Sequence, residues 1–391
     1  MTERFYTRNV IVLAKAQAAQ GTEETPTVGS DAVRVRDEAT PQANMQSSQS
    51  GYLKGEIDAS EPISNGGSMS LPLKCWMTGA GTAGTAPDWG KHLLGCAMQA
   101  VLTASAVTGT AQDGDTGTIT LASSGSSSTD DAYIGMPITI DGGTGDGQTR
   151  VISGYVGTSK VASVYPDWDT APDSTSTYTI AANARYAPIT QGQKNLTLVQ
   201  YLRNAETAGN ALRRRQFDSM GDYSIALTPK QPVEIAFTFQ GLLPAVPDDV
   251  SDPGDATYTG ADPESYMGAQ TWLGGDAVKI NNFTLRAGNG IQMFDDPAAQ
   301  FGTGPAEITT RTITGTITPP LTLAATRNAF ADWIAGTTKP LWLCWGSASG
   351  KMVSIFIPSL LYTGNQPGNT NGRETEQLPF QVVGPIYIAV F

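Results

Sequence analysis

The sequence predicts a mainly β fold (α+β) in which sheets dominate and helices are short. Residues 307–318 alternate between two faces, with Ile313, Gly315 and Ile317 on one face and threonines on the other. Alternation of β-branched residues with period two is typical of a half-buried strand. Residues 233–239 alternate in the same way, and the chain holds 43 Gly and 24 Pro. Many turns, with abundant Ser and Thr and little Lys, favour sheet over helix.

Length and charge narrow the possible classes of protein. A chain of 391 residues is long enough for two or three domains. Its net charge of −12 argues against nucleic-acid binding through a basic surface. Cys75, Cys96 and Cys344 lie in apolar surroundings, so we expect buried free thiols from a reducing compartment. No segment is apolar for long enough to be a secretory signal or a membrane span, so no membrane partner is expected.

The N-terminal region predicts strands around one long loop. Residues 1–20 are typical of a strand or an arm. Residues 21–50 are polar and rich in Gly, Pro, Gln and Ser, which predicts a flexible loop around a short strand at 33–35. Further strands are expected at 68–77 and at 53–57, where the pattern seen at 313–317 returns as Leu53, Gly55 and Ile57.

A short helix is expected at 87–98, after a loop rich in Gly, Ala and Thr. Proline suits the first position of a helix, and Pro87 stands there. Trp89, Leu93 and Ala97 follow at a spacing of four, which places them on one helical face.

Residues 104–184 differ in amino-acid composition from the rest of the chain. They hold nine Asp and no Glu but only two basic residues, Arg150 and Lys160. This stretch therefore carries more than half of the net charge. It consists of short strands between Gly/Ser/Asp turns, expected at 117–121, 136–141, 150–155, 160–164 and 178–180. We interpret it as an inserted small β-domain whose two ends lie close together. The expected domains are then 1–103, the insertion 104–184, and 185–391.

Strands and surface segments are expected to alternate after the insertion. The strands are predicted at 195–203, 223–227, 233–239 and 277–286, the second and third of them forming a hairpin. Arg213, Arg214 and Arg215 predict a basic connector, and residues 243–270, rich in Pro, Asp and Gly, a long surface loop.

The C-terminal part combines a strand, a helix and a hairpin. Pro319 and Pro320 end the strand at 307–318, because proline has no N–H for the ladder. Phe330, Trp333 and Ile334 have helical spacing, with Gly336 as the stop. Residues 341–345 and 352–357 predict a buried hairpin. The apolar alternation of 377–391 predicts a last strand tied into a sheet, its own or a neighbour's.

Motifs that would carry catalysis or cofactor binding are few. Residues 79–84 match GxGxxG, but no acidic residue follows about twenty positions later, and a flexible Gly/Ala loop is the better interpretation. His92 is the only histidine and is expected to be a packed or surface residue. The Asp-Gly turns at 113–115 and 141–146 lack the spaced ligands of a calcium loop. We therefore expect no catalytic, cofactor or metal site.

The order of several loose motifs resembles the major tail tube proteins of long-tailed, siphovirus-like bacteriophages. The C-terminal half carries this resemblance at 309–319, 330–336, 338–341, 350–358 and 378–380, and the N-terminal half at 51–57 and 81–90. Residues 130–136 through 173–178 resemble a small β-module that recurs in phage virion proteins. Together these segments cover most of the chain.

The resemblance implies a structural virion protein that polymerises with itself. Subunit sheets join sideways into rings with a β-barrel inner wall, and rings stack into a hollow tube through which viral DNA passes without specific binding. Two tube-like domains per chain would give trimeric rings with pseudo-sixfold symmetry. The implied partners are the tape measure, tail tip and tail terminator proteins. The implied location is the phage tail, assembled in the host cytoplasm, with the insertion on the outer surface.

The expected contact residues follow from the loops and the termini. Ring stacking and intersubunit contacts are assigned to 37–50, 243–270, 384–391 and the arginine run, through Asp37, Glu38, Arg213, Arg214, Arg215, Ile388 and Phe391. The tube sheet is assigned to Leu53, Gly55, Ile57, Ile313, Gly315 and Ile317. Two alternatives stay open: a head-decoration or a receptor-binding, glycan-binding virion protein, and more weakly an enzyme with paired carboxylates.

Overall fold

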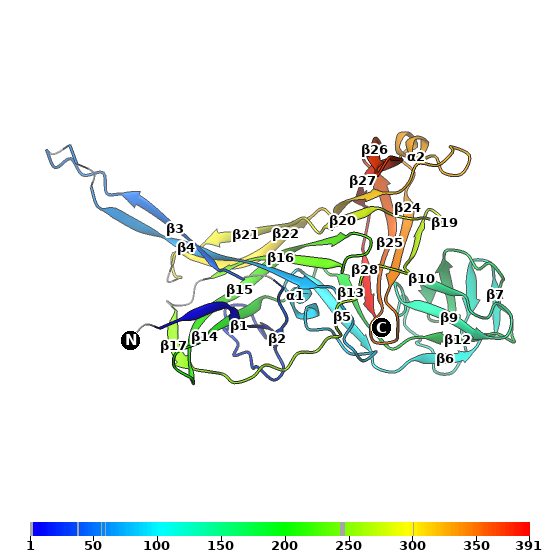
Figure 1. The fold of residues 1–391 in the computed structure, drawn as a ribbon, viewed down its shortest axis with the longest axis horizontal. Coiled ribbons are helices and arrows are strands. Elements are labelled where there is room, and N and C mark those ends of the chain that lie inside the picture. The colour runs from blue at the N-terminus through cyan, green and yellow to red at the C-terminus, as the bar shows by residue number, and fades with distance from the viewer. Residues whose placement is uncertain (1–2, 37–38, 56, 59, 243–246, 300) are drawn as a thin grey trace.

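Antiparallel strands make up most of the protein. The structure, a computed structural model, describes residues 3–36, 39–55, 57–58, 60–242, 247–299 and 301–391. In that part of the chain the helices are α1 (Gly90–Leu94) and α2 (Ala329–Ala335). An arm projects at one end of the elongated molecule and a separate small sheet lies at the other (Figure 1). No helix within the described residues is long and apolar enough to cross a membrane. The prediction of a mainly β fold with short helices is confirmed.

One layer of the body, which we call the β16 layer, is a continuous antiparallel sheet. Its strands pair in the order β4–β16–β15–β20–β23–β27. Their bounds are β4 (Pro62–Trp76), β16 (Glu234–Leu242), β15 (Asn210–Leu227), β20 (Asn282–Arg286), β23 (Thr314–Thr318) and β27 (Arg373–Val382). Alternate side chains on these strands, such as Phe237, Leu285 and Ile317, enter the main hydrophobic core. The strand expected at 307–318 is divided in two, β22 (Thr303–Arg311) and β23, with Thr312 and Ile313 between them. The expected hairpin of β15 and β16 is confirmed.

A second layer, the β28 layer, covers that core from the other side. It pairs in the order β5–β13–β28–β25–β24–β18–β19. The bounds are β5 (Met98–Thr103), β13 (Asn183–Pro188), β28 (Tyr387–Val390), β25 (Val353–Tyr362), β24 (Lys339–Trp345), β18 (Gln270–Leu273) and β19 (Asp276–Ala277). Val353, Ile355 and Ile388 of this layer are buried in the main core. The two layers join where β25 pairs with β27.

A third, smaller sheet covers helix α1. It contains β1 (Phe5–Ala16), β2 (Ala32–Val33), β14 (Leu196–Asn204), β17 (Asp248–Ser251) and the first half of β15. A Cβ on Gly95, at the end of α1, would lie 2.6 Å from Leu196 of this sheet and 3.1 Å from Phe239 of the β16 layer. Helix α1 is therefore enclosed between the two sheets.

The insertion forms its own seven-stranded sheet with its own core. The strands are β6 (Val107–Thr110), β7 (Asp113–Asp115), β8 (Thr118–Thr120), β9 (Pro137–Gly142), β10 (Thr149–Val156), β11 (Val161–Tyr165) and β12 (Thr177–Ile180). Val107 pairs with Ile180, and Thr103 of the body pairs with Asn183. The predicted closeness of the two ends is confirmed.

The insertion is docked firmly onto the body. Val151 of β10 packs with Trp342, Phe356 and Phe391 in a separate small core on the far face of the β28 layer. The Tyr165 hydroxyl donates to the carbonyl oxygen of Pro340 at 3.1 Å. Apolar burial and hydrogen bonds together fix the orientation of the insertion.

One order of elements occurs twice in the chain: a hairpin, then a helix preceded by a strand of the β16 layer, then another strand. In the first copy the second strand of the hairpin, β4, is itself the strand before the helix, and in the second copy a separate strand, β23, follows the hairpin. The first copy is β3 (Gln42–Gln49) with β4, then α1 and β5. The second is β21 (Asn289–Asp295) with β22 (Thr303–Arg311), then β23, α2 and β24. The strand before each helix pairs with a later strand (β4 with β16, β23 with β27), and the strand after it pairs with the next (β5 with β13, β24 with β25).

Three expectations about local structure are wrong. Leu53, Gly55 and Ile57 do not form a strand but lie in the loop between β3 and β4, because Gly55 has a φ of +74° and no sheet lies beside them. Residues 42–49, expected as loop, are β3, whose side chains are exposed on both faces and therefore give no apolar pattern. Arg213, Arg214 and Arg215 are not a connector but part of β15, paired with β14 and β17.

Candidate functional site: a polar sheet face, an exposed arm and a bare helix

The face of the β16 layer that points away from the core is covered by small polar side chains. The register places Thr238 and Ala236 of β16 beside Asp222 and Ser224 of β15, and β20 and β23 continue the same face. Its members are Ser70, Pro72, Lys74, Glu234, Ala236, Thr238, Gln240, Asp222, Ser224, Ala226, Asn282, Thr284, Arg286, Thr314, Thr316, Gln377, Pro379 and Gln381. We call this surface the polar face. Short hydroxyl and amide side chains on a solvated antiparallel face are the counterpart of the apolar side chains on its core side.

Charge on the polar face is balanced by short-range pairing. Arg286 Nε lies 2.8 Å from Asp222 Oδ2, and Lys74 Nζ lies 3.6 Å from Glu234 Oε1. Arg36 reaches Glu234 as well and stacks over the Trp76 ring. Two acidic and two basic residues of the polar face thus offset one another. The surface presents little net field to a charged molecule that moves along it.

The polar face is hollowed along its centre. A depression is lined by residues of β15, β20, β23 and β27, among them Ser224, Thr284, Thr316 and Pro379. Gly315 leaves room there for the neighbouring strand and ring, since a Cβ at this position would lie 2.4 Å from the carbonyl oxygen of Thr284 and 2.5 Å from the Phe380 ring. Gly315 and Ile317 lie in this sheet, and their assignment to the tube sheet stays a prediction. Ile313 is buried directly before β23, and its carbonyl oxygen accepts a hydrogen bond from the Val382 N–H of β27 at 2.9 Å.

The arm, residues 42–70, is the most exposed part of the described chain. All eight side chains of β3 are exposed, and β3 pairs only with β4. Figure 1 shows the arm extending far beyond the body. Tyr52 is 74% exposed, Leu53 102% and Ile57 106%. A lone two-stranded ribbon is marginally stable in water, so an arm of this shape is suited to a partner surface.

Helix α2 is well formed but uncovered. Asn328 accepts a hydrogen bond from the Ala331 N–H at 3.0 Å, and Gly336 ends the helix in the left-handed conformation, as predicted. Phe330 is 53% exposed and Ile334 70%, and only Ala329 of the helix is buried. The predicted helical face is therefore present without an intramolecular cover.

The structure places the other expected contact residues inside the subunit. Arg213 pairs with Asp248, which holds the pKa of that carboxyl below its usual range, and Arg215 pairs with Glu23. Arg214 is half-buried between them in β15. Ile388 is fully buried in β28 and Phe391 is 6% exposed, so the segment 384–391 belongs to the subunit's own sheet and is not a free stacking arm. Asp37 and Glu38 lie outside the described residues.

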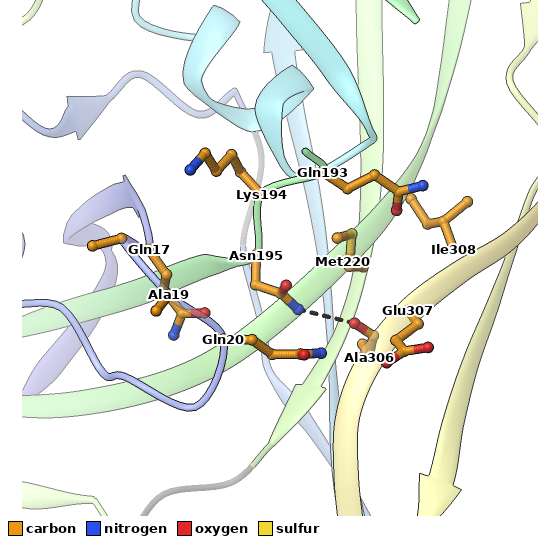
Figure 2. Close-up of a pocket in the computed structure, with 11 residues that line it drawn as sticks. Gln17, Ala19, Gln20, Gln193, Lys194, Asn195, Met220, Ala306, Glu307 and Ile308 are labelled. Carbon is orange, nitrogen blue, oxygen red and sulfur yellow. Dashed lines mark hydrogen bonds between the residues drawn. The ribbon is translucent and has the colours of Figure 1, made fainter. Parts of the chain in front are cut away.

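A small polar pocket lies where β1, β14 and β22 meet (Figure 2). Asn195 donates to the carbonyl oxygen of Ala306 at 2.9 Å, and Gln17, Gln193 and Glu307 surround it. Amide side chains and main-chain groups line this pocket, and the Asn195 hydrogen bond ties the body to β22 of the second hairpin. We assign it a structural role.

The titratable residues considered for chemistry are buried in apolar surroundings. His92 is fully buried beside the rings of Phe237 and Phe239, and this burial lowers its pKa to about 3. Burial raises the pKa of the Cys75 and Cys96 thiols and that of Cys344 to about 12, which leaves these thiols protonated and inert. No His/Cys/Asp/Glu cluster suited to a metal occurs among the described residues.

The glycine-rich loop 79–84 has a packing role. Gly81 N–H donates to the carbonyl oxygen of Gly350 at 2.8 Å, and a Cβ on Gly79 would lie 2.1 Å from the same oxygen. The loop therefore needs glycine in order to approach the turn between β24 and β25.

The comparisons with known proteins point to a structural role. The sequence model of one protein family, described as phage tail tube protein, matches residues 7–382. The chain belongs to the phage tail tube protein family. A search of curated proteins finds no match. This tail tube protein is a structural subunit of the virion tail and not an enzyme, and membership of the family implies that it polymerises with itself into a tube. The family match decides against the head-decoration, glycan-binding and enzyme alternatives.

Proposed function

We propose that three chains close into each ring of the tail tube and that the polar face lines its bore. The strands of the β16 layer from neighbouring chains then form the inner β-barrel, which leaves no open sheet edge at the wall. The single observation that carries this proposal is the polar face itself, a wide surface of short polar side chains with paired charges.

The repeated order of elements supports three chains rather than six. Each chain contains two copies of the repeated order, and β4 of the first copy and β23 of the second lie in the same continuous layer. Three such chains supply six equivalent units, which gives a ring with pseudo-sixfold symmetry. We assign one tube-like domain to each copy, with the insertion placed between β5 and β13 of the first.

A charge-balanced wall suits the passage of DNA better than a basic wall. Free cations along the bore would hold phosphates by counterion release, and a strongly acidic wall would repel them. Here Asp222 with Arg286, and Glu234 with Lys74, neutralise each other locally. Viral DNA would therefore slide past hydroxyl and amide groups without a specific contact. In the same scheme the tape measure protein fills the bore during assembly, and tail tip and terminator proteins contact the two ends.

Cryo-electron microscopy of assembled tubes tests the ring. We expect three chains per ring with the polar face towards the axis and the insertions on the outside. Rings of six chains, or a bore lined by the β28 layer, would contradict the proposal.

Cysteine labelling tests the lining in solution. Thr284 is exposed at the centre of the polar face, and the three natural cysteines are buried. A Thr284→Cys variant is expected to react with a large polyethylene-glycol maleimide as a free subunit but not in the tube. Val156→Cys on the insertion, where Val156 is 48% exposed, is the control and should react in both states. Equal labelling of Thr284→Cys in both states would argue against an inward-facing polar face.

A further inference from the structure

Large apolar side chains are exposed mainly in two groups in the described part of the chain. One group belongs to the arm and comprises Met45, Tyr52, Leu53, Ile57 and Ile63. The other, which we call the α2 patch, comprises Leu321, Leu323, Phe330, Trp333 and Ile334. Leu323 is 80% exposed, so the patch extends from the helix into the segment that precedes it. Clusters of exposed large apolar side chains on a folded subunit mark surfaces that a partner covers.

The chain's own arm cannot cover its own α2 patch. Figure 1 shows the arm tip at one end of the long axis and α2 beyond the middle of the body towards the other end. The arm is held in its direction by its pairing with β4, which continues into the β16 layer. The two apolar surfaces can therefore meet only between different copies of the chain.

The α2 patch is preformed and rigid. The helix is capped at both ends, and Asp332 is tied to Lys339 of β24 at 3.0 Å. The segment before it is held by Arg327, which pairs with Glu376 at 3.0 Å and donates to the Pro320 carbonyl. The Phe330 and Trp333 rings meet edge to face, with centroids 5.7 Å apart. A ligand for this surface would not have to order it first.

We propose that the α2 patch is the docking site for the arm tip of a second copy in the neighbouring ring. This inference rests on the proposed function and names the surface that receives the arm. Leu53 and Ile57 supply the apolar contact. A hollow bordered by Asp276, Asn328 and Lys339 lies beside the helix, and its exposed Asp276 carboxylate offers a partner for Lys54.

The contact joins two different surfaces of the chain, so it can be repeated from one ring to the next. An arm and a patch at different places on one chain make a head-to-tail contact that does not close on itself, which yields a filament. A stable interface buries about 800 Å² on each partner, and a few apolar side chains supply only part of that area. The contact therefore becomes strong when a whole ring presents several arms at once. Single chains are expected to remain dispersed until rings form.

Mixed disulfide formation tests the contact directly. A Leu53→Cys chain is mixed with an Ile334→Cys chain under oxidising conditions, at concentrations where tubes form. We expect a disulfide between the two variants, seen on non-reducing gels. Val156→Cys in place of Ile334→Cys is the matched control, because Val156 is also an exposed apolar residue, and no disulfide is expected there.

Loss of the apolar surface tests the same contact without crosslinking. The double variant Phe330→Ser with Ile334→Ser should raise the concentration needed for tube formation at least about tenfold, whereas Val156→Ser should leave it unchanged. Leu53→Ser with Ile57→Ser should have the same effect as the α2 variant, since both remove one side of one contact.

The outcomes separate the inference from the proposed function. Tubes without the Leu53→Cys–Ile334→Cys disulfide, or disulfides only between two Ile334→Cys chains, would overturn the inference and leave the tube intact. Failure of the unmodified chain to form tubes, even on tail-tip initiators, would count against the proposed function. The disulfide is scored in samples that contain tubes, so its absence there counts against the inference alone.

Discussion

Helices α1 and α2 hold corresponding places in the repeated order of elements, yet their surroundings are opposite. In α1, His92 and Leu93 are fully buried, as is Trp89 directly before it. In α2, Phe330, Trp333 and Ile334 are exposed although their spacing is equally helical. The difference comes from the third sheet, in which β1, β2 and β14 cover α1. An apolar helical face thus predicts that something covers the helix, but not that the cover belongs to the same chain.

The largest expected effect comes from removing a buried side chain of α1. Leu93→Ala should lower the free energy of unfolding by about 2–5 kcal/mol, because it leaves a cavity in a closed core. Ile334→Ala on α2 should change it by less than about 0.5 kcal/mol, as at other exposed sites. Urea denaturation of the dispersed subunit measures both values.

A volume-conserving control sharpens this test. Leu93→Met keeps the volume and should cost less than about 1.5 kcal/mol. Equal destabilisation by Leu93→Ala and Ile334→Ala would show that α2 is covered in the dispersed subunit.

A second, intermediate effect depends on pH and concerns α1 alone. The pKa of His92 is about 3 in the folded chain, against an ordinary value of 6.5. The unfolded state therefore takes up the proton first as pH falls. Stability is full above pH 6.5, decreases by about 1.4 kcal/mol per pH unit below it, and levels off near pH 3. At pH 5 the loss is about 2 kcal/mol.

Replacing His92 with an apolar residue separates its contribution to the pH dependence of stability from that of the carboxylates. Within the described residues, neither ring nitrogen of His92 has a hydrogen-bond partner, so His92→Leu should be tolerated. The difference in unfolding free energy between the two proteins should shrink or change sign between pH 7 and pH 5. A constant difference across this range would contradict the buried neutral imidazole.

The smallest expected effect concerns the cap of α2. Asn328→Ala removes the acceptor for the Ala331 N–H and should cost the helix about 1 kcal/mol. Because α2 is uncovered, the loss should appear as faster hydrogen exchange at Ala331 with little change in global unfolding. Asn328→Asp keeps an acceptor oxygen and should exchange almost as slowly as the natural chain. A global loss of stability in Asn328→Ala would mean that α2 supports the core.

Much of the fold could be predicted because its strands carry one apolar face. The alternation at 233–239 and 313–317, the helix stop at Gly336 and the double proline after Thr318 all indicated elements that exist. The strands of the insertion were found for the same reason. Strand β3 was missed because both of its faces are polar and exposed.

The contact surfaces were harder to predict because they depend on how the strands pair in the folded sheets. The arginine run looked like a free basic surface, but pairing of β15 with β17 brings Asp248 to Arg213. The apolar C-terminal residues could not be assigned to their own sheet until β25 and β13 were known to flank them. The polar face becomes visible only when the register aligns the outward side chains of six strands. The apolar residues Leu53 and Ile57 of the arm were the one sign of a contact surface in the sequence. Their alternation was instead interpreted as a strand.

The insertion takes the place of a short turn, and its loss would therefore expose surface elsewhere on the chain. In the second copy of the repeated order, β24 and β25 are joined by residues 346–352, whereas in the first copy β5 and β13 are joined by the whole insertion. Loss or exchange of this module would leave the β5–β13 ladder unchanged. It would, however, uncover Trp342, Phe356 and Phe391, which the insertion now shields. A lineage that sheds the module must therefore acquire polar residues on that face, so the two changes are expected to be inherited together.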